Sequence, residues 1–255
     1  FFPNALTVMN AMMGLMAVFF AVQGRVREAS LFLLGAALFD KLDGALARRL
    51  GLTEPAPGSE HRSARVSMGG LLDDIADALS FCIAPAVSFF TLMSDTPDAL
   101  MQRLPYGWVA LAYAVAGIGR LVYFTLDTAP IPGFFKGMPT PAGALLVIAP
   151  MVIFSQVAGD APEMERFWAV FSFGLMIATA LMMNASPIRY LHIGRWMGRH
   201  PWLTRFNLLA LMLSLLTPFY GHMLLIQMLL YTLSPFVTGR IDPQIAAQGK
   251  RPKAL

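Results

Sequence analysis

Five aspartates of this chain lie within two strongly apolar stretches, where ionisable side chains are not expected. Asp40 and Asp43 lie in the stretch 30–50, and Asp73, Asp74 and Asp77 lie in the stretch 70–93. Together they are five of the 15 Asp and Glu residues of the chain. An ionisable group inside a membrane-crossing helix is unfavourable, so such a group is functional by default. These stretches are therefore the first place to look for a site.

The spacing of four of these aspartates predicts that they share one pocket. Asp40 and Asp43 are three positions apart and Asp73 and Asp77 are four apart, so each pair lies on one face of a helix. The two stretches follow one another and would run antiparallel, with both pairs near the same end. The four carboxylates would repel one another there, and hard divalent cations, which prefer oxygen ligands, would relieve the repulsion. We expect two Mg²⁺ or Mn²⁺ ions, a pair able to activate and clamp oxygens in phosphoryl displacement.

Small residues and an arginine accompany the aspartates. Gly44 follows Asp43, and Gly69 lies one turn before Asp73; glycine permits close approach by another backbone or a ligand. Arg48 ends the first stretch, where its guanidinium could hold a phosphate. The set predicts a site for a diphosphate-linked substrate. The alternative is an ion pathway in a cation transporter, in which the glycines and Arg48 have no evident place.

The composition predicts a membrane protein. Of the 255 residues, 56% are hydrophobic and 13% are charged, about half the charged fraction of a soluble protein. That charge is too little to cover a soluble domain, which disfavours a soluble enzyme or a secreted domain. Cys82 is the only cysteine, so an internal disulfide and a thiolate metal site are excluded. The net charge of +4 is too small and dispersed to indicate nucleic-acid binding.

Apolar segments of membrane-crossing length predict an all-α polytopic membrane protein of about eight transmembrane helices. The segments are 5–22, 30–50, 70–93, 107–126, 140–158, 167–185, 204–219 and 222–238. The last two share a short turn and should form a helical hairpin. No cleavable signal sequence or separate soluble domain is expected, so 1–239 is predicted to be one integral membrane catalytic domain and 240–255 a tail.

The distribution of Lys and Arg predicts the orientation. If the N-terminus is cytoplasmic, the outside loops hold only Arg25, Arg27, Arg103 and Arg166. Most other basic residues then fall on the inside, including those around 187–205 and in the tail. By the positive-inside rule, both termini and the aspartates are expected on the cytoplasmic side of the cell (inner) membrane, among membrane lipids.

The two aspartate stretches resemble the signature of the CDP-alcohol phosphotransferases, D-x-x-D-G-x-x-A-R followed by G-x-x-x-D-x-x-x-D. Its eight positions are occupied here by Asp40, Asp43, Gly44, Ala47, Arg48, Gly69, Asp73 and Asp77. The resemblance implies a core of six membrane helices, a homodimer, and displacement of CMP from a CDP-linked lipid by an alcohol.

The resemblance also implies roles for these residues. The four aspartates would be the metal ligands, and Asp77 would also be the general base that takes the proton of the acceptor hydroxyl. The remaining signature residues would line the part of the site that binds the cytidine diphosphate. Asp74 matches no signature position and is expected to be a polar neighbour.

One segment departs from the family pattern. Twenty residues separate Arg48 from Gly69, where the family usually has a shorter connection. The insertion, about 52–66, should be a cytoplasmic loop at the mouth of the site. It is either a tolerated lengthening, since long loops cost little, or a lid or acceptor contact.

Three further segments resemble the phosphatidylserine synthase branch of the family. Residues 3–10 match its P-N-x-x-T-x-x-N start, which adds Thr7 and Asn10 to the predicted CDP-binding residues. Residues 80–86 are similar to S-F-G-V-A-P-A, with Cys82 in place of the usual Gly, and residues 135–144 resemble F-x-G-L-P-S/T-P-A-A-A. The two helices beyond six also suit this branch. The resemblance implies that CDP-diacylglycerol and L-serine give phosphatidylserine and CMP.

A serine acceptor needs a cation for its carboxylate. Arg120, inside the span 107–126, and Lys136, before the next span, are candidates, and Thr140 in the matching loop is a third acceptor contact. Alternatively, Arg120 pairs with a buried carboxylate and Lys136 only follows the positive-inside rule. Choline, inositol phosphate and glycerol phosphate remain possible acceptors, although the phosphorylated ones would require further basic residues.

Overall fold

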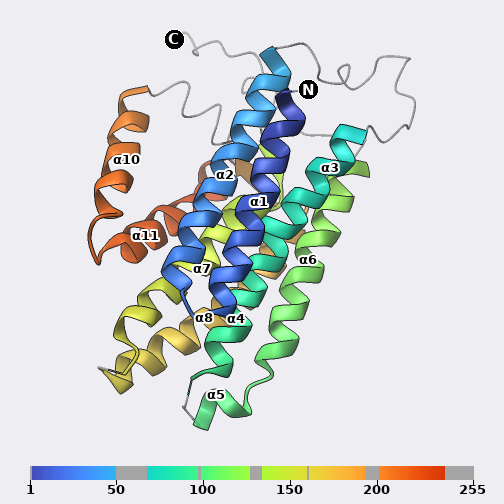
Figure 1. The fold of residues 1–255 in the computed structure, drawn as a ribbon. Helices are drawn as coiled ribbons and strands as arrows, with labels where there is room; N and C mark the ends of the chain where they lie inside the picture. The colour runs from blue at the N-terminus through green and yellow to red at the C-terminus, as the bar shows by residue number, and fades with distance from the viewer. Residues whose placement is uncertain are drawn as a thin grey trace.

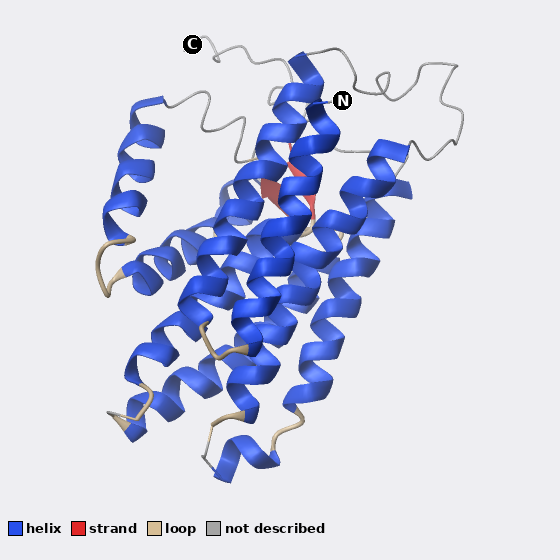
Figure 2. Cartoon of the chain, in the orientation of Figure 1, coloured by secondary structure: helices blue, strands red, loops and turns tan. Residues whose placement is uncertain are grey.

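The structure, a computed structural model, describes residues 2–49, 68–96, 99–126, 134–159, 161–192 and 201–238. These residues form a bundle of helices with one small two-stranded sheet (Figures 1 and 2). In chain order the elements are α1 (Phe2–Val22), α2 (Val26–Arg49), α3 (Met68–Asp77), the π-helical segment η1 (Ala78–Ile83), α4 (Ala84–Ser94), α5 (Ala99–Arg103), α6 (Tyr106–Leu126), β1 (Phe134–Lys136), α7 (Thr140–Val157), α8 (Pro162–Asn184), β2 (Arg189–Leu191), α10 (Pro201–Ser214), α11 (Tyr220–Thr232) and α12 (Ser234–Thr238).

The helices confirm an all-α, multi-pass membrane protein. Six segments of the described chain are long and apolar enough to cross a membrane. Helix α2, with 24 residues, is also long enough, although its aspartates lower its hydropathy. The segment predicted at 204–219 is shorter than expected: α10 has 14 residues, a length of about 21 Å. Pro218 follows shortly after the end of α10, and proline cannot continue a helix.

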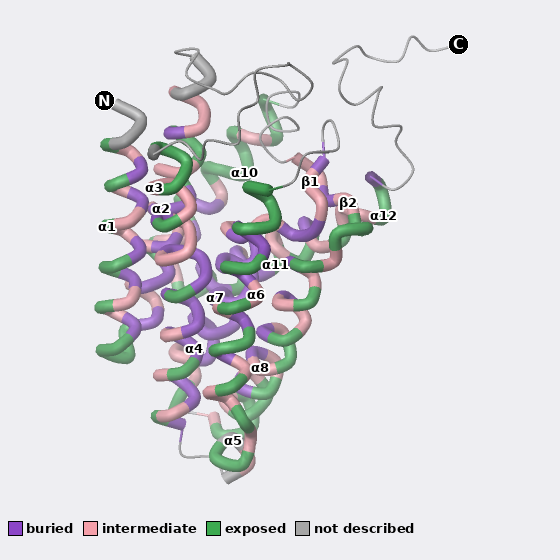
Figure 3. The backbone as a smooth tube through the Cα atoms, turned by 90° about the vertical axis from the view of Figure 1, so that its right-hand side faces the viewer, coloured by how far each residue is buried: buried purple, intermediate pink, exposed green. Residues whose placement is uncertain are grey.

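Helix α7 forms the centre of the bundle (Figure 3). Its residues are buried on all sides from Ala142 to Phe154, the pattern of a helix enclosed by others. Large apolar side chains on surrounding helices point outward, among them Trp108 and Val115 of α6 and Leu181 of α8. An apolar exterior of this kind suits contact with lipid.

A widened helical turn, η1, follows the last aspartate of α3 directly. Pro85 has no N–H group, so the carbonyl of Phe81, four residues earlier, loses its usual helical donor. The hydroxyl of Tyr113 on α6 donates to that carbonyl instead, at 3.1 Å. The N–H of Ala84 bonds the carbonyl of Leu79, five residues back, which is the π-helical step. Such π-helical turns are frequent at functional sites.

The C-terminal elements attach to the sheet near the end of the bundle where α2 ends and α3 begins (Figure 2). Strands β1 and β2 pair antiparallel, with Phe135 opposite Tyr190. The hydroxyl of Tyr231 in α11 donates to the carbonyl of Leu191 at 3.1 Å, and the hydroxyl of Thr238 in α12 donates to the carbonyl of Arg189. Helices α11 and α12 are therefore attached to β2.

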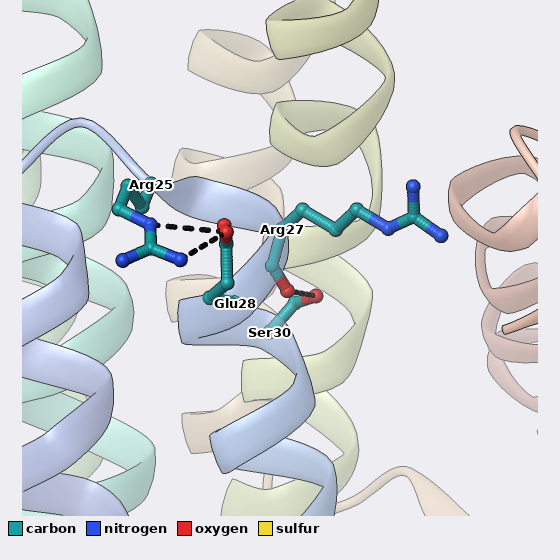
Figure 4. A network of polar contacts seen from close by, with 4 residues as sticks. All are labelled: Arg25, Arg27, Glu28 and Ser30. Atoms are coloured by element: carbon teal, nitrogen blue, oxygen red, sulfur yellow. Dashed lines mark hydrogen bonds and ion pairs between the residues drawn. The ribbon is translucent and has the colours of Figure 1, made fainter.

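After the C-terminal end of α10, the connection to α11 is hydrogen-bonded to an arginine at the start of α2. Arg27 donates to the carbonyl of Leu215 at 2.7 Å and to that of Thr217 at 3.4 Å. Figure 4 shows Arg27 extending away from its neighbour Arg25, which instead bonds Glu28. The α10–α11 connection thus lies beside the α1–α2 turn, as expected for the predicted hairpin.

Candidate active site

Three of the four predicted aspartates converge between α2 and α3. One carboxylate oxygen from each of Asp40, Asp73 and Asp77 lies within 4.8 Å of the others. The helices bring them together because α2 ends and α3 begins at the same end of the bundle, beside α1 (Figure 1). We call these three residues the aspartate cluster.

The fourth aspartate, Asp43, lies on the side of α2 that faces α1. It is buried and accepts a hydrogen bond from the hydroxyl of Thr7. Its charge interacts with that of Asp73. Asp43 therefore belongs to the same charged site, although it does not belong to the closest group of three.

Asn10 of α1 is hydrogen-bonded to Asp77, the last aspartate of the signature. Its Nδ2 donates to Oδ1 of Asp77 at 2.9 Å, while its own Oδ1 is buried and has no hydrogen-bond partner among the described residues. The hydroxyl of Ser80 in η1 donates to the Asn10 carbonyl at 3.0 Å, which fixes α1 against η1. Thr7 and Asn10 are one turn apart on α1. The structure therefore places both against carboxylates, each on a different helix.

The donor set of the cluster suits a hard cation. Asp73 and Asp77 form no ion pair with a Lys or Arg in the described part of the chain. Three carboxylate oxygens at this separation repel one another when no cation is present. An all-oxygen set is the type that Mg²⁺ and Mn²⁺ prefer over softer metals.

The other signature residues are placed less completely. Gly44 is half-buried and Gly69 is exposed, both near the aspartate cluster in the chain. The side chains of Ala47 and Arg48, the insertion at 52–66 and the tail at 240–255 lie outside the described residues.

Asp74 points toward α6 rather than joining the cluster. The hydroxyl of Thr125 donates to Oδ2 of Asp74 at 2.9 Å. The prediction that Asp74 is a polar neighbour agrees with this contact. Thr125 was not predicted, because no motif marks it.

Arg120 is a buried cation on α6. It is 5% exposed, and its guanidinium forms no hydrogen bond or ion pair with the described residues. It lies 5.9 Å from the ring centre of Phe124, and the Tyr231 phenol and the Asp77 carboxylate lie within range of its charge. No carboxylate of the described residues forms an ion pair with Arg120. This disfavours the alternative in which a buried carboxylate neutralises Arg120.

The two other acceptor candidates lie next to the sheet. Lys136 is half-buried in β1, opposite Arg189 of β2. Thr140 is 2% exposed and begins α7 directly after Pro139. The sheet itself was not predicted, since its two strands are far apart in the sequence and only three residues long.

Comparisons with known proteins cover the part of the chain that carries this site. A sequence model of the CDP-alcohol phosphatidyltransferase family matches residues 1–184. The chain is 32% identical over 197 residues to a CDP-diacylglycerol–serine O-phosphatidyltransferase of Mycobacterium leprae (strain TN), covering 74% of this chain and 58% of that protein. It is 30% identical over 151 residues to the protein of that name in Bacillus subtilis (strain 168), covering 58% and 74%.

A third relative has a different name. The archaetidylserine synthase of Methanothermobacter thermautotrophicus is 28% identical over 148 residues, covering 57% of this chain and 55% of that protein. The match spans about three fifths of the length of the mycobacterial relatives. The matched segment includes the aspartate cluster, its partners on α1, and Arg120. The chain belongs to the CDP-alcohol phosphatidyltransferase family.

Proposed function

We propose that this protein transfers the phosphatidyl group of CDP-diacylglycerol to the hydroxyl of L-serine, giving phosphatidylserine and CMP. The observation that carries the proposal is the convergence of Asp40, Asp73 and Asp77 oxygens within 4.8 Å. The family match includes this site, and the printed names of the relatives support serine as the acceptor.

The four aspartates would hold two divalent cations, Mg²⁺ or Mn²⁺. The oxygen-only donor set supports this assignment. Bound there, the cations would neutralise the diphosphate and stabilise the charge on departing CMP. The hydrogen bonds from Thr7 to Asp43 and from Asn10 to Asp77 would fix the orientation of two of the ligands.

Asp77 would be the general base. Asn10 donates to its Oδ1, which leaves Oδ2 to take the proton of the serine hydroxyl. The serine oxygen then forms a bond to the lipid-side phosphorus, and the bond from that phosphorus to the bridging diphosphate oxygen breaks. CMP leaves with that oxygen, and the proton remains on Asp77. Gly44, Ala47, Arg48 and Gly69 would line the cytidine diphosphate part of the site.

Arg120 would bind the carboxylate of serine. A guanidinium that is buried and has no partner in the described chain needs an anion, and a planar carboxylate fits its fork of donors. The Asp77 carboxylate lies within range of the Arg120 charge, which supports a place for both residues in one site. Lys136 and Thr140 remain candidates for further acceptor contacts.

The site would face the cytoplasm, across the inner membrane from the α1–α2 turn. Helix α1 begins, and α2 ends, at the end of the bundle that carries the aspartates (Figure 1). The basic residues around 187–205 follow α8, which runs toward that same end. The positive-inside rule then supports this orientation.

The first test is CMP release by detergent-purified protein with CDP-diacylglycerol and Mg²⁺ or Mn²⁺. Serine, glycerol 3-phosphate, inositol phosphate, inositol and choline are offered separately, with Asp77→Asn as the blank. Release with serine alone, absent in the blank, is expected. Release only with another acceptor would preserve the class and overturn serine as the substrate. No release with any acceptor would contradict the transferase and favour a cation transporter.

A further inference from the structure

Helix α11 brings a tyrosine to the region of Arg120, although α11 lies outside the segment that the family model matches. Tyr231 is buried, and its neutral phenol lies within electrostatic range of the Arg120 cation. The matched segment ends at residue 184. The signature therefore does not account for Tyr231.

Ring contacts place Tyr231 and Arg120 around the same face of the small sheet. Phe135 and Tyr190 are opposite one another in β1 and β2, so their side chains share one face. The ring of Tyr190 lies 5.8 Å from that of Tyr231, and the ring of Phe135 lies 6.5 Å from that of Phe124. Phe124 in turn lies under the Arg120 guanidinium. A series of aromatic side chains in contact therefore links Tyr231 to Arg120.

The hydroxyl of Tyr231 has a fixed orientation. It donates its proton to the carbonyl of Leu191 at 3.1 Å. A phenol oxygen can accept as well as donate, so the lone pairs of this oxygen remain available to a ligand. The region therefore offers a charged donor, Arg120, and a neutral acceptor, Tyr231.

We propose that Tyr231 is a specificity-determining residue for the acceptor, whose hydroxyl oxygen accepts a hydrogen bond from the ammonium group of the amino acid while Arg120 binds the carboxylate. The inference rests on the proposed function, because it takes an amino acid as the acceptor. A phosphorylated polyol has no ammonium group to use this contact. The C-terminal hairpin would thereby contribute to acceptor selection as well as to packing.

The test compares Tyr231→Phe with Tyr113→Phe in the CMP-release assay. Tyr113 is a matched control, because its buried hydroxyl also donates to a backbone carbonyl at 3.1 Å. Tyr231→Phe should raise the KM for serine about tenfold, the loss typical of a hydrogen bond to a charged group. It should leave kcat and the KM for CDP-diacylglycerol nearly unchanged. Tyr113→Phe should leave the KM for serine unchanged.

A second measurement separates contact with the ammonium group from a general disturbance of the structure around Arg120 and Tyr231. The serine analogue 3-hydroxypropionate has the carboxylate and hydroxyl of serine but no ammonium group, and it is tested as a competitor of serine in the formation of phosphatidylserine. Its inhibition constant against serine should be the same for the wild type and Tyr231→Phe. An equal rise for the inhibitor and for serine, or an unchanged KM for serine, would overturn the inference while leaving the transferase intact. A wild type without serine-dependent release would overturn the proposed function and the inference together.

Discussion

Two charged regions of opposite sign lie within the membrane bundle, and they are built differently. The aspartate cluster gathers like charges from two consecutive helices, and side chains of α1 hold Asp43 and Asp77 in place. Arg120 stands on α6 without a hydrogen bond or ion pair in the described chain, beside aromatic residues from distant segments. Repulsion among the aspartates and burial of the arginine each favour a ligand of the opposite charge. The first region is encoded by local spacing, and the second depends on tertiary structure.

Asp77→Asn should produce the largest effect. The variant keeps the shape of the side chain but cannot take a proton, so CMP release should fall about a thousandfold, within the usual range for a general base. The adjacent Asp74→Asn is the control, since Asp74 bonds Thr125 rather than joining the cluster, and it should change turnover little. Similar losses in both variants would indicate that general disturbance of α3, rather than base catalysis, explains the effect.

Arg120→Met should separate function from stability in the other region. The KM for serine should rise about thirtyfold, because a charged contact to the carboxylate is lost. The ligand-free protein should nevertheless melt at a higher temperature, by about 3 °C, because a buried, unpaired guanidinium is replaced by an apolar side chain of similar length. The measurements are serine titrations and thermal melts in detergent. A lower melting temperature with an unchanged KM would assign Arg120 to the fold.

The same difference explains what could be predicted from the sequence. The convergence of Asp40, Asp73 and Asp77 was predictable because helical periodicity is a local property. Residues three or four positions apart lie on the same face of a helix. The hydrogen bond from Asn10 to Asp77 crosses 67 residues. The motif marked Asn10 as important, but it could not show that the residue holds a carboxylate.

The π-helical turn and the surroundings of Arg120 had no comparable local signal. The π-helical turn arises from Pro85, but its freed carbonyl is satisfied by Tyr113 of another helix. The surroundings of Arg120 depend on the pairing of two three-residue strands and on Tyr231 of α11. Neither the strand pairing nor the position of α11 follows from hydropathy, which predicted only a helical hairpin in this segment.

Gly117→Ala tests the packing between the two regions, where η1 meets α6. A Cβ atom at Gly117 would lie 2.6 Å from the sulfur of Cys82, so the variant should lose about 2 kcal/mol of stability through overpacking. Adding Cys82→Gly removes the sulfur and should restore most of the loss, as measured by thermal melts. Equal stability of the single and double variants would contradict this contact.

Asp73→Asn should show whether the cluster stores repulsion in the absence of metal. With EDTA present, removal of one of the converging charges should stabilise the protein by on the order of 1 kcal/mol. With Mg²⁺ or Mn²⁺ added, the wild type should be more stable than Asp73→Asn, because only the wild type retains the full set of ligands. Thermal melts with and without cation provide the measurement, and CMP release should be lost with EDTA and recover when cation is restored. A wild-type melting temperature that neither cation changes would contradict a metal site.

The smallest effects should come from two arginines at the far end of the bundle. Arg25 forms an exposed ion pair with Glu28 (Figure 4), so Arg25→Gln should cost at most about 0.5 kcal/mol. Arg27 is half-buried and donates to the carbonyl of Leu215 at 2.7 Å, so Arg27→Gln should cost about 1 kcal/mol. Neither variant should change the rate of CMP release at saturating substrates. Tyr231 belongs to the same C-terminal hairpin that Arg27 attaches to α2. A higher KM for serine in Arg27→Gln, but not in Arg25→Gln, would therefore show that this attachment influences the acceptor region around Tyr231.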